Sequence, residues 1–226
     1  MMTATLELLI GTTNAGKGRE LHELLAPHGF EIRTLKDVSN PIEVVEDGDS
    51  FAANACKKAR ELAQHLECWV IADDSGIEVD ALDGAPGIYS ARYASQGANQ
   101  GANQGANEGA SQSQDAGSDQ RNNAKLLDEL ADVPRARRTA NYYCHVAVAD
   151  PRGEIRAEST GICRGLIGTE PAGTNGFGYD PLFEVVELHR TFGQLGPRIK
   201  AALSHRARAM RAIVPQLAKL AERGDW

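Results

Sequence analysis

The chain has 226 residues, with 24 Lys or Arg and 31 Asp or Glu, so its formal net charge at pH 7 is −7. This length fits one domain, or one domain with an added lobe, and can bury a core without disulfides. The acidic balance argues against a nucleic-acid-binding protein, because such proteins present a broad basic face to phosphates. The acidic net charge is still compatible with a small anionic ligand, since a local cluster of cations can hold phosphates.

The sequence shows neither an apolar run of about 18 residues nor a basic segment followed by an apolar one near residue 1. We therefore expect no membrane span and no signal peptide. The cysteines Cys56, Cys68, Cys144 and Cys163 are spaced as in neither a zinc site nor a disulfide framework. We expect reduced thiols in the core of a cytoplasmic protein.

Two adjacent carboxylates follow an apolar stretch near the middle of the chain. Residues 68–72 form an apolar run of strand length, and Asp73 and Asp74 follow at once, so we expect the strand to end there. Neighbouring buried carboxylates raise each other's pKa unless a cation lies between them. Two interpretations stay open: a turn, which Asp-Ser-Gly favours, and a Mg²⁺ site at the carboxyl end of the strand.

The N-terminal pattern is strand, small-residue segment, helix. Residues 6–10 predict a buried strand, and residues 19–25 predict a helix with leucines on one face. Residues 11–17 between them offer backbone N–H groups and a helix N-terminus to an anion. They nearly match the P-loop pattern, but Gly18 stands where that pattern has a hydroxyl ligand of Mg²⁺. An ordinary turn with a surface lysine is the alternative.

An acidic segment leads into a second predicted helix, which either Asp49 or Ser50 caps. Asn54 and Lys58 lie one turn apart beside its apolar face. Glu46 precedes the helix, where its carboxylate could join a metal site with the aspartate pair or merely suit the helix dipole. The apolar face comprises Phe51, Ala55, Ala59 and Leu62.

Residues 95–118 contain a Gly-Ala-Asn-Gln-like repeat without apolar periodicity. This pattern predicts a flexible loop with no catalytic role. We expect the loop to be inserted in a single domain that spans residues 1–226. Pro215 should kink the last helix or end it early. Further strands are predicted over residues 30–35, 139–149 and 154–163, a turn over 150–153 and a helix over 119–130.

Aromatic and basic residues gather in the C-terminal third. Residues 176–180 read Gly-Phe-Gly-Tyr-Asp, which leaves Phe177 free to meet a flat ligand or simply forms a packed turn. Lys200, His205 and Arg206 predict a cationic cluster at the start of the last helix. Because positive charge is unfavourable there, an anion or a base carbonyl should lie opposite.

Together these motifs resemble those of the inosine triphosphate pyrophosphatases, also described as XTP/dITP diphosphatases. The resemblance covers nearly the whole chain except the repeat. It implies an α/β fold with a long mixed twisted β-sheet flanked by helices, two lobes with a central cleft, and a homodimer. The matching stretches are residues 12–17, 46–51 with 54–55, 72–82, 84–93, 176–181 and 204–206.

The resemblance also implies a reaction and a site. Non-standard purine nucleoside triphosphates (ITP, dITP and XTP) would be hydrolysed to the monophosphate and pyrophosphate, which cleanses the nucleotide pool. Glu46 and Asp74 would hold Mg²⁺, with Asp74 as the proton acceptor, and Ser75 would contact the substrate. The triphosphate would be held by Thr12, Thr13, Asn14, Ala15, Gly16 and Lys17. The base would meet Phe177, Gly178, Tyr179, Asp180, Lys200, His205 and Arg206, with Phe177 stacked on the purine.

The chain departs from the family pattern in three places. Gln194 stands where a Glu is usual, and residues 196–199 replace an acidic stretch that usually precedes Lys200. Ala201 stands where an Asn is common, and the repeat lengthens one loop. Two alternatives to the pyrophosphatase remain: a P-loop-like NTPase or phosphotransferase, and a purine-nucleotide-binding protein without turnover. The first would release orthophosphate, and the second would bind ITP without hydrolysing it.

Overall fold

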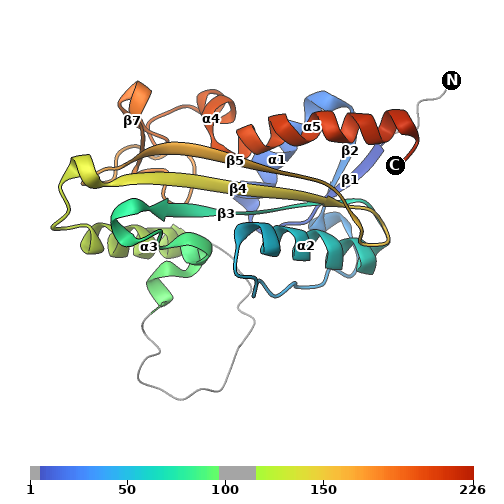
Figure 1. Cartoon of the computed structure of the whole chain (residues 1–226), viewed down its shortest axis with the longest axis horizontal. Coiled ribbons are helices and arrows are strands. Elements are labelled where there is room, and N and C mark those ends of the chain that lie inside the picture. The colour runs from blue at the N-terminus through green and yellow to red at the C-terminus, as the bar shows by residue number, and fades with distance from the viewer. Residues whose placement is uncertain (1–5, 97–115) are drawn as a thin grey trace, which may run out of the picture. The chain divides into compact units, whose positions relative to one another are not determined.

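The computed structural model describes residues 6–96 and 116–226 (Figure 1). Within these ranges one mixed sheet has the strand order β2-β1-β3-β4-β5-β6-β7. The strands are β1 (Leu6–Ile10), β2 (Phe30–Thr34), β3 (Val70–Val79), β4 (Thr139–Ala149), β5 (Ile155–Ile167), β6 (Phe183–Val185) and β7 (Arg190–Thr191). The helices are α1 (Ala15–Leu25), α2 (Phe51–Leu66), α3 (Ala116–Glu129), α4 (Pro197–Leu203) and α5 (His205–Arg223).

The sheet is mixed because its two ends pair differently. β1 pairs in parallel with β2 and with β3, whereas β6 pairs antiparallel with β5 and with β7. The predicted mixed sheet flanked by helices is therefore confirmed. The core of the predicted repeat loop, residues 97–115, lies outside the described residues, and α3 begins at Ala116, before the predicted end of that loop.

The described residues pack into two compact units. The first draws on Met1–Ser75, Tyr143–Ile162 and Ala201–Trp226. The second draws on Gly76–Tyr142 and Cys163–Lys200. The strands β3, β4 and β5 each supply residues to both units.

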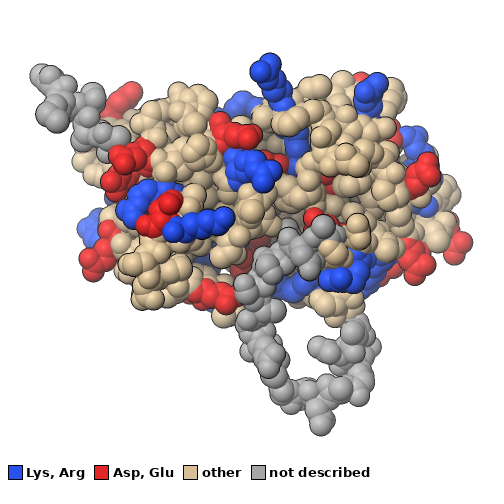
Figure 2. Space-filling model, turned by 180° about the vertical axis from the view of Figure 1, so that it is seen from behind, with Lys and Arg blue, Asp and Glu red and all other residues tan. Residues whose placement is uncertain are grey.

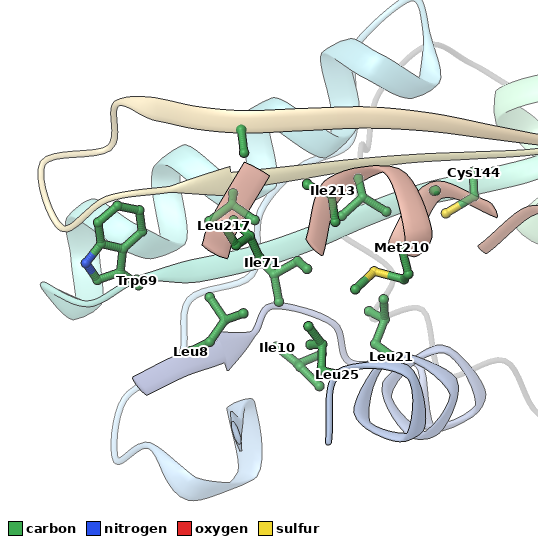
Figure 3. Close-up of a cluster of buried hydrophobic side chains, with 14 residues drawn as sticks. Leu8, Ile10, Leu21, Leu25, Trp69, Ile71, Cys144, Met210, Ile213 and Leu217 are labelled. Carbon is green, nitrogen blue, oxygen red and sulfur yellow. The ribbon is translucent and has the colours of Figure 1, made fainter. Parts of the chain in front are cut away.

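In the first unit, helices cover both faces of the strands. Side chains alternate along β1, so that Leu8 and Ile10 face α1 and α5 while Leu9 faces α2. Figure 3 shows the cluster on the α1 and α5 side, where Leu21, Met210 and other apolar side chains meet the strands. Each fully buried leucine there contributes about 1.5–3 kcal/mol to the free energy of unfolding.

The face of the sheet toward α2 is lined by small residues. Ala55, Ala59 and Ala63 of α2 pack near Ala72 of β3 and Ala147 of β4. Because methyl groups occupy this interface, the helix backbone can approach the strands closely. Ser50 caps α2, since its hydroxyl accepts a hydrogen bond from the Ala53 N–H at 3.2 Å, which decides between the two predicted caps.

Strand β3 differs most from its prediction. The sequence predicts a strand that ends before the aspartates, with a turn over Asp-Ser-Gly as one interpretation; instead β3 continues through Asp73 and Asp74 to Val79. Both the early end and the turn are therefore wrong. The strand continues because cations meet the two carboxylates, so their charge does not force the backbone to the surface.

Smaller differences concern the ends of elements. Helix α5 continues through Pro215, so the proline does not end it early, and Gly224 follows at φ +72°. The predicted turn after β4 is present, with the Gly153 N–H donating to the Asp150 carbonyl at 2.7 Å. All four thiols are free, but only Cys144 and Cys163 are buried. Short 3-10 segments occupy Ala26–His28, Leu35–Asp37, Asp80–Leu82, Gly87–Ser95, Arg135–Arg137 and Val186–Leu188.

Charged side chains of both signs are interspersed on the face drawn in Figure 2. In the described part of the chain, no helix combines the length and the apolar character that a membrane span needs.

Candidate active site

A tight turn joins β1 to α1 in the first unit. Gly11 is required at the end of β1, because a Cβ there would lie 2.8 Å from Cδ1 of Leu62. Asn14 caps α1 by accepting a hydrogen bond from the Lys17 N–H at 2.9 Å. The predicted phosphate-binding segment thus consists of a short loop with Thr12 and Thr13, followed by the first turn of a helix with Ala15, Gly16 and Lys17. A helix N-terminus is a suitable place for an anion.

Lys17 points toward the aspartates rather than into solvent. Its Nζ lies 3.9 Å from Oδ2 of Asp73 and 3.9 Å from Oδ1 of Asp74. The side chain is only 14% exposed. The alternative of an ordinary turn with a surface lysine is therefore wrong for this side chain.

Asp73 forms a buried ion pair with Arg206. Its Oδ2 accepts from Nη2 of Arg206 at 2.8 Å and from Nε at 3.2 Å, and the guanidinium also contacts Glu20. Burial alone would raise the pKa of Asp73, but the cations of Lys17 and Arg206 more than offset it, so the pKa falls below its ordinary value. Asp73 is therefore held ionised.

The anion opposite Arg206 is thus supplied by the protein. The guanidinium is buried and also donates to the Ser75 hydroxyl at 2.9 Å. The sequence predicts a cationic cluster opposite an anion or a base carbonyl; of its members, Lys200 pairs with Asp180. His205 is buried at the first position of α5, next to the cap residue Ser204.

Asp74 lies among groups from α2 and from the segment before it. Its Oδ2 accepts from Nδ2 of Asn54 at 3.1 Å, and its Oδ1 lies 3.6 Å from Nζ of Lys58. The same Nζ donates to Oε1 of Glu46 at 2.9 Å. Glu46 and Asp74 therefore both meet the ammonium group of Lys58. We use the name carboxylate–lysine cluster for the five residues Glu46, Asp74, Lys58, Lys17 and Asn54.

The two aspartates have opposite pKa shifts. Burial raises the pKa of Asp74 above its ordinary value; Lys58 and Lys17 oppose this, whereas Glu46 adds to it. Burial also acts on Glu46, but Lys58 and Lys17 prevail and lower the pKa of that carboxyl. A carboxylate with a raised pKa is the better proton acceptor, so Asp74 is the member of the pair suited to acid–base chemistry.

The donor set in this cluster fits a hard divalent cation. Carboxylate oxygens of Glu46 and Asp74 both contact the positive charge of Lys58, and carboxylate oxygens are the ligands that Mg²⁺ prefers. In addition, Oδ1 of Asp73 is buried and accepts no hydrogen bond from the described residues. One acidic oxygen next to Asp74 in the sequence is therefore buried without a hydrogen-bond donor from the described residues.

The second unit contains the Gly-Phe-Gly-Tyr-Asp turn. The Asp180 carboxylate accepts from the Phe177 N–H at 2.9 Å, and a Cβ on Gly176 would lie 1.8 Å from that carboxylate. Gly178 has φ +62°, which favours glycine. The glycines are thus required by the turn itself, rather than only by freedom for the aromatic ring.

Helix α3 holds this turn in place. The Gly178 N–H donates to Oδ2 of Asp119 at 2.6 Å, and Nδ2 of Asn123 donates to the Gly178 carbonyl at 3.1 Å. Next to the turn is an open cavity of about 530 Å³. Its lining includes Asp119, Asn123, Phe177, Gly178 and Pro181.

The predicted base-binding residues of this unit divide into lining and support. Phe177 and Gly178 line the cavity. Tyr179 is buried, and its hydroxyl donates to the Ser90 carbonyl at 2.8 Å. Lys200 is paired with Asp180, and its Nζ lies 4.5 Å from the centre of the Phe177 ring. Asp180 and Lys200 therefore position Phe177, whereas Tyr179 anchors the turn to Ser90.

Sequence reasoning missed several of these residues as parts of a site. Asn54 and Lys58 gave a signal, since two polar residues one turn apart bordered an apolar helix face. Asp119 and Asn123 gave no such signal, because polar residues are common on the solvent-facing side of any surface helix. Glu20 likewise resembled an exposed residue of a short amphipathic helix.

A cluster of carboxylates and lysines beside a helix N-terminus is typical of enzymes that act on phosphate esters. The family model of the Ham1 family matches residues 8–216. This chain belongs to the Ham1 family. It is 48% identical over 221 residues to a dITP/XTP pyrophosphatase of Rhodopirellula baltica, covering 98% of this chain and 97% of that protein.

A further relative and a solved structure are similar to this chain over nearly its whole length. A dITP/XTP pyrophosphatase of a Nostoc species is 42% identical over 213 residues, covering 94% of this chain and 95% of that protein. Among solved structures, a HAM1 protein of Coxiella burnetii matches with a TM-score of 0.76 and 31% identity. That match covers 95% of this chain and all of the other.

Proposed function

We propose that this protein hydrolyses non-standard purine nucleoside triphosphates, namely dITP, XTP and ITP, to the monophosphate and pyrophosphate. Relatives up to 48% identical over nearly the whole chain are dITP/XTP pyrophosphatases. The structural observation that carries the proposal is the carboxylate–lysine cluster. In it, the pKa of the buried Asp74 carboxylate is raised while that of Glu46 is lowered.

The first unit supplies the groups for the phosphates and for water. The Lys17 ammonium and the N–H groups at the start of α1 bind phosphate oxygens. Asp74 orients the attacking water and accepts its proton. Asn54 fixes the carboxylate through a hydrogen bond to Oδ2, and Oδ1 accepts from the Ser75 N–H at 3.0 Å and keeps its second lone pair for this task. Arg206 holds Asp73 and Ser75 in position through hydrogen bonds to both side chains.

We further propose that the reaction depends on Mg²⁺, with Glu46 and Asp74 as its protein ligands. When bound, the ion neutralises phosphate charge and lowers the pKa of water. The support is the approach of the Glu46 and Asp74 carboxylates to one ammonium group, the Oδ1 of the neighbouring Asp73 that no donor of the described residues reaches, and the preference of Mg²⁺ for carboxylates. Phosphoryl-type transfer relies mainly on positioning and charge neutralisation, which these groups and Lys17 provide.

The second unit supplies an aromatic surface for the base. Phe177 lines the open cavity, and Lys200 holds its ring through a cation–π contact. Hypoxanthine and xanthine carry a carbonyl acceptor at the 6-position, where adenine carries an amine donor. A site that donates a hydrogen bond to this carbonyl can reject the wrong base by roughly 10⁴-fold. We propose that the purine stacks on Phe177 and that a basic side chain reads the carbonyl.

The test is pyrophosphate release from ITP, XTP, dITP, GTP, ATP and dTTP, with and without Mg²⁺. The proposal expects pyrophosphate, Mg²⁺ dependence and a preference for the first three nucleotides. Orthophosphate as the product would indicate an NTPase or phosphotransferase instead. Binding of ITP without any product would indicate a nucleotide-binding protein. The resemblance also supports a homodimer in the cytoplasm. Light scattering measures the oligomeric state.

A further inference from the structure

Three chemically different side chains of the first unit meet at a place that takes no part in the proposed reaction. Cys56 belongs to α2, His145 to β4 and Glu158 to β5. The thiol sulfur, one imidazole nitrogen and one carboxylate oxygen all lie within 4.8 Å of one another. Thiol, imidazole and carboxylate are the three protein ligand types of zinc.

The measured distances match the spacing of zinc ligands. Sγ of Cys56 lies 3.5 Å from Oε2 of Glu158, and Nε2 of His145 lies 3.5 Å from the same oxygen. In a tetrahedral zinc site, ordinary bond lengths place sulfur and oxygen about 3.6 Å apart, and nitrogen and oxygen about 3.4 Å apart. Two edges of such a tetrahedron therefore exist before any ion is bound.

The histidine is oriented as a ligand. Its Nε2 is buried and makes no hydrogen bond with the described residues. Its Nδ1 lies 2.8 Å from Oγ1 of Thr160. The threonine hydroxyl can accept a hydrogen bond from the Nδ1–H group, which leaves the lone pair on Nε2 directed at Cys56 and Glu158. Metal-bound histidines commonly have such a partner on the other nitrogen.

The cluster is reachable from solvent. The Glu158 side chain is 59% exposed, and Cys56 is partly exposed. Water can therefore fill a fourth position on a bound ion. The thiol and imidazole favour Zn²⁺ over Mg²⁺ and Ca²⁺, which take oxygen ligands. A nucleophilic role for Cys56 is disfavoured, because burial and the neighbouring Glu158 raise the pKa of its thiol to about 11.

We propose that Cys56, His145 and Glu158 bind one Zn²⁺ ion, which clips helix α2 to strands β4 and β5. The same helix carries Asn54 and Lys58, which contact Asp74 and Glu46. An occupied clip would therefore fix the helix that supports the carboxylate–lysine cluster. The proposal does not depend on the proposed reaction.

The test uses the full chain after a chelator has removed bound metal. Co²⁺ is then added stepwise in the presence of excess Mg²⁺, which saturates sites made only of oxygen ligands. Co²⁺ serves as the probe, because a thiolate–Co²⁺ pair gives a near-ultraviolet charge-transfer band and four-coordination gives intense visible bands. We expect one Co²⁺ per chain with both signatures, displaced by one Zn²⁺. Zn²⁺ at a hundred times its dissociation constant should raise Tm by about 5–10 °C.

Single substitutions locate the site. Cys56→Ser should abolish the charge-transfer band and the rise in Tm, and His145→Gln should weaken binding about tenfold or more. Cys68→Ser is the matched control, because Cys68 is also a partly exposed thiol but lies outside the cluster. Glu46→Gln should leave the band intact even if it abolishes hydrolysis, which separates this proposal from the proposed function.

The proposal is overturned if the band is absent, if it survives Cys56→Ser, or if Cys68→Ser removes it. Metal-free Tm values show whether each variant is folded. If Cys56→Ser does not fold, the His145→Gln variant decides through the loss of four-coordinate visible bands with the thiol intact. Unchanged bands in that variant would also overturn the proposal.

Discussion

The Nζ of Lys58 lies 3.6 Å from Oδ1 of Asp74, in the interior of the first unit. The same nitrogen lies 2.9 Å from Oε1 of Glu46, so one cation links the two carboxylates that we assign to Mg²⁺. Lys58 is 8% exposed, and the two acids raise its pKa against the effect of burial, which lowers it. The lysine therefore balances charge that the metal would otherwise balance.

Replacing Lys58 with methionine keeps the side-chain length and removes the charge. We expect Lys58→Met to destabilise the metal-free protein by about 1–3 kcal/mol, because two buried carboxylates lose their shared partner. Added Mg²⁺ should then raise Tm more in the variant than in the natural chain. Lys57→Met is the control, since Lys57 lies on the same helix as Lys58 and pairs with the exposed Asp47, which precedes that helix. Equal Mg²⁺ responses in both variants would refute the shared-cation account.

Asp73 should matter for folding rather than for turnover. Asp73→Asn leaves Arg206 buried with only part of its negative partners, which should cost about 3 kcal/mol of unfolding free energy. The exposed pair of Glu7 and Arg33 supplies the control, because Glu7→Gln should cost less than about 0.5 kcal/mol. Denaturant unfolding measures both. A negligible cost for Asp73→Asn would show that the pair does not stabilise the fold.

The same pair sets a pH dependence of stability. Because the pKa of Asp73 is lower in the folded than in the unfolded state, its ionisation stabilises the fold above the unfolded value of about 3.9. That contribution disappears as the pH falls toward the folded-state value. The stability difference between the natural chain and Asp73→Asn should therefore shrink below about pH 4. A difference that stays constant or grows on acidification would contradict the ion pair.

The acid limb of the pH–rate profile should report Asp74. Since burial raises the pKa of Asp74 in the metal-free protein, protons should compete with Mg²⁺ for this carboxylate, and kcat/KM for ITP at subsaturating Mg²⁺ should fall at a pH above the ordinary value of an aspartate. Lys58 lowers this pKa, so the limb should move to higher pH in Lys58→Met. Steady-state rates over a pH series measure both positions. A limb at the same pH in the two proteins would show that another group controls it.

Phe177 should contribute binding rather than chemistry. Removing a ring that stacks on a base costs about 1–3 kcal/mol, so Phe177→Ala should raise KM for ITP roughly 5–150-fold with kcat little changed. Phe177→Tyr keeps the ring and should retain a KM near that of the natural chain. If Phe177→Ala left KM unchanged, the cavity beside the Gly-Phe-Gly-Tyr-Asp turn would not be the base site.

Local patterns predicted most elements of the fold. The alternation in β1 and the apolar stripe of α2 identified both elements, and Ser50 was one of two caps named from residue type. The path of β3 through Asp73 and Asp74 was beyond such patterns. Whether a strand can carry two carboxylates depends on cations from distant segments, here Lys58 and Arg206. The spacing of residues along the sequence does not predict these contacts between distant segments.

The site was predicted in part for the same reason. A metal site that joins Glu46 to the aspartate pair was one of two interpretations, the resemblance singled out Asp74, and the structure shows the lysine that joins Glu46 and Asp74. Arg206 was expected to face a ligand, yet its partners are Asp73 and Glu20. The thiol of Cys56 was expected in the core without a ligand role, because its cluster forms only when α2 packs against β4 and β5.

The central claim is that Asp74 accepts a proton from water during release of pyrophosphate. The most direct measurement compares Asp74→Asn with the natural chain for pyrophosphate release from ITP with Mg²⁺, alongside ITP binding to both. We predict that turnover falls about 10²–10⁴-fold while binding and Tm are largely kept, because the amide replaces the carboxylate with little change in shape. Turnover of Asp74→Asn close to that of the natural chain would contradict the claim.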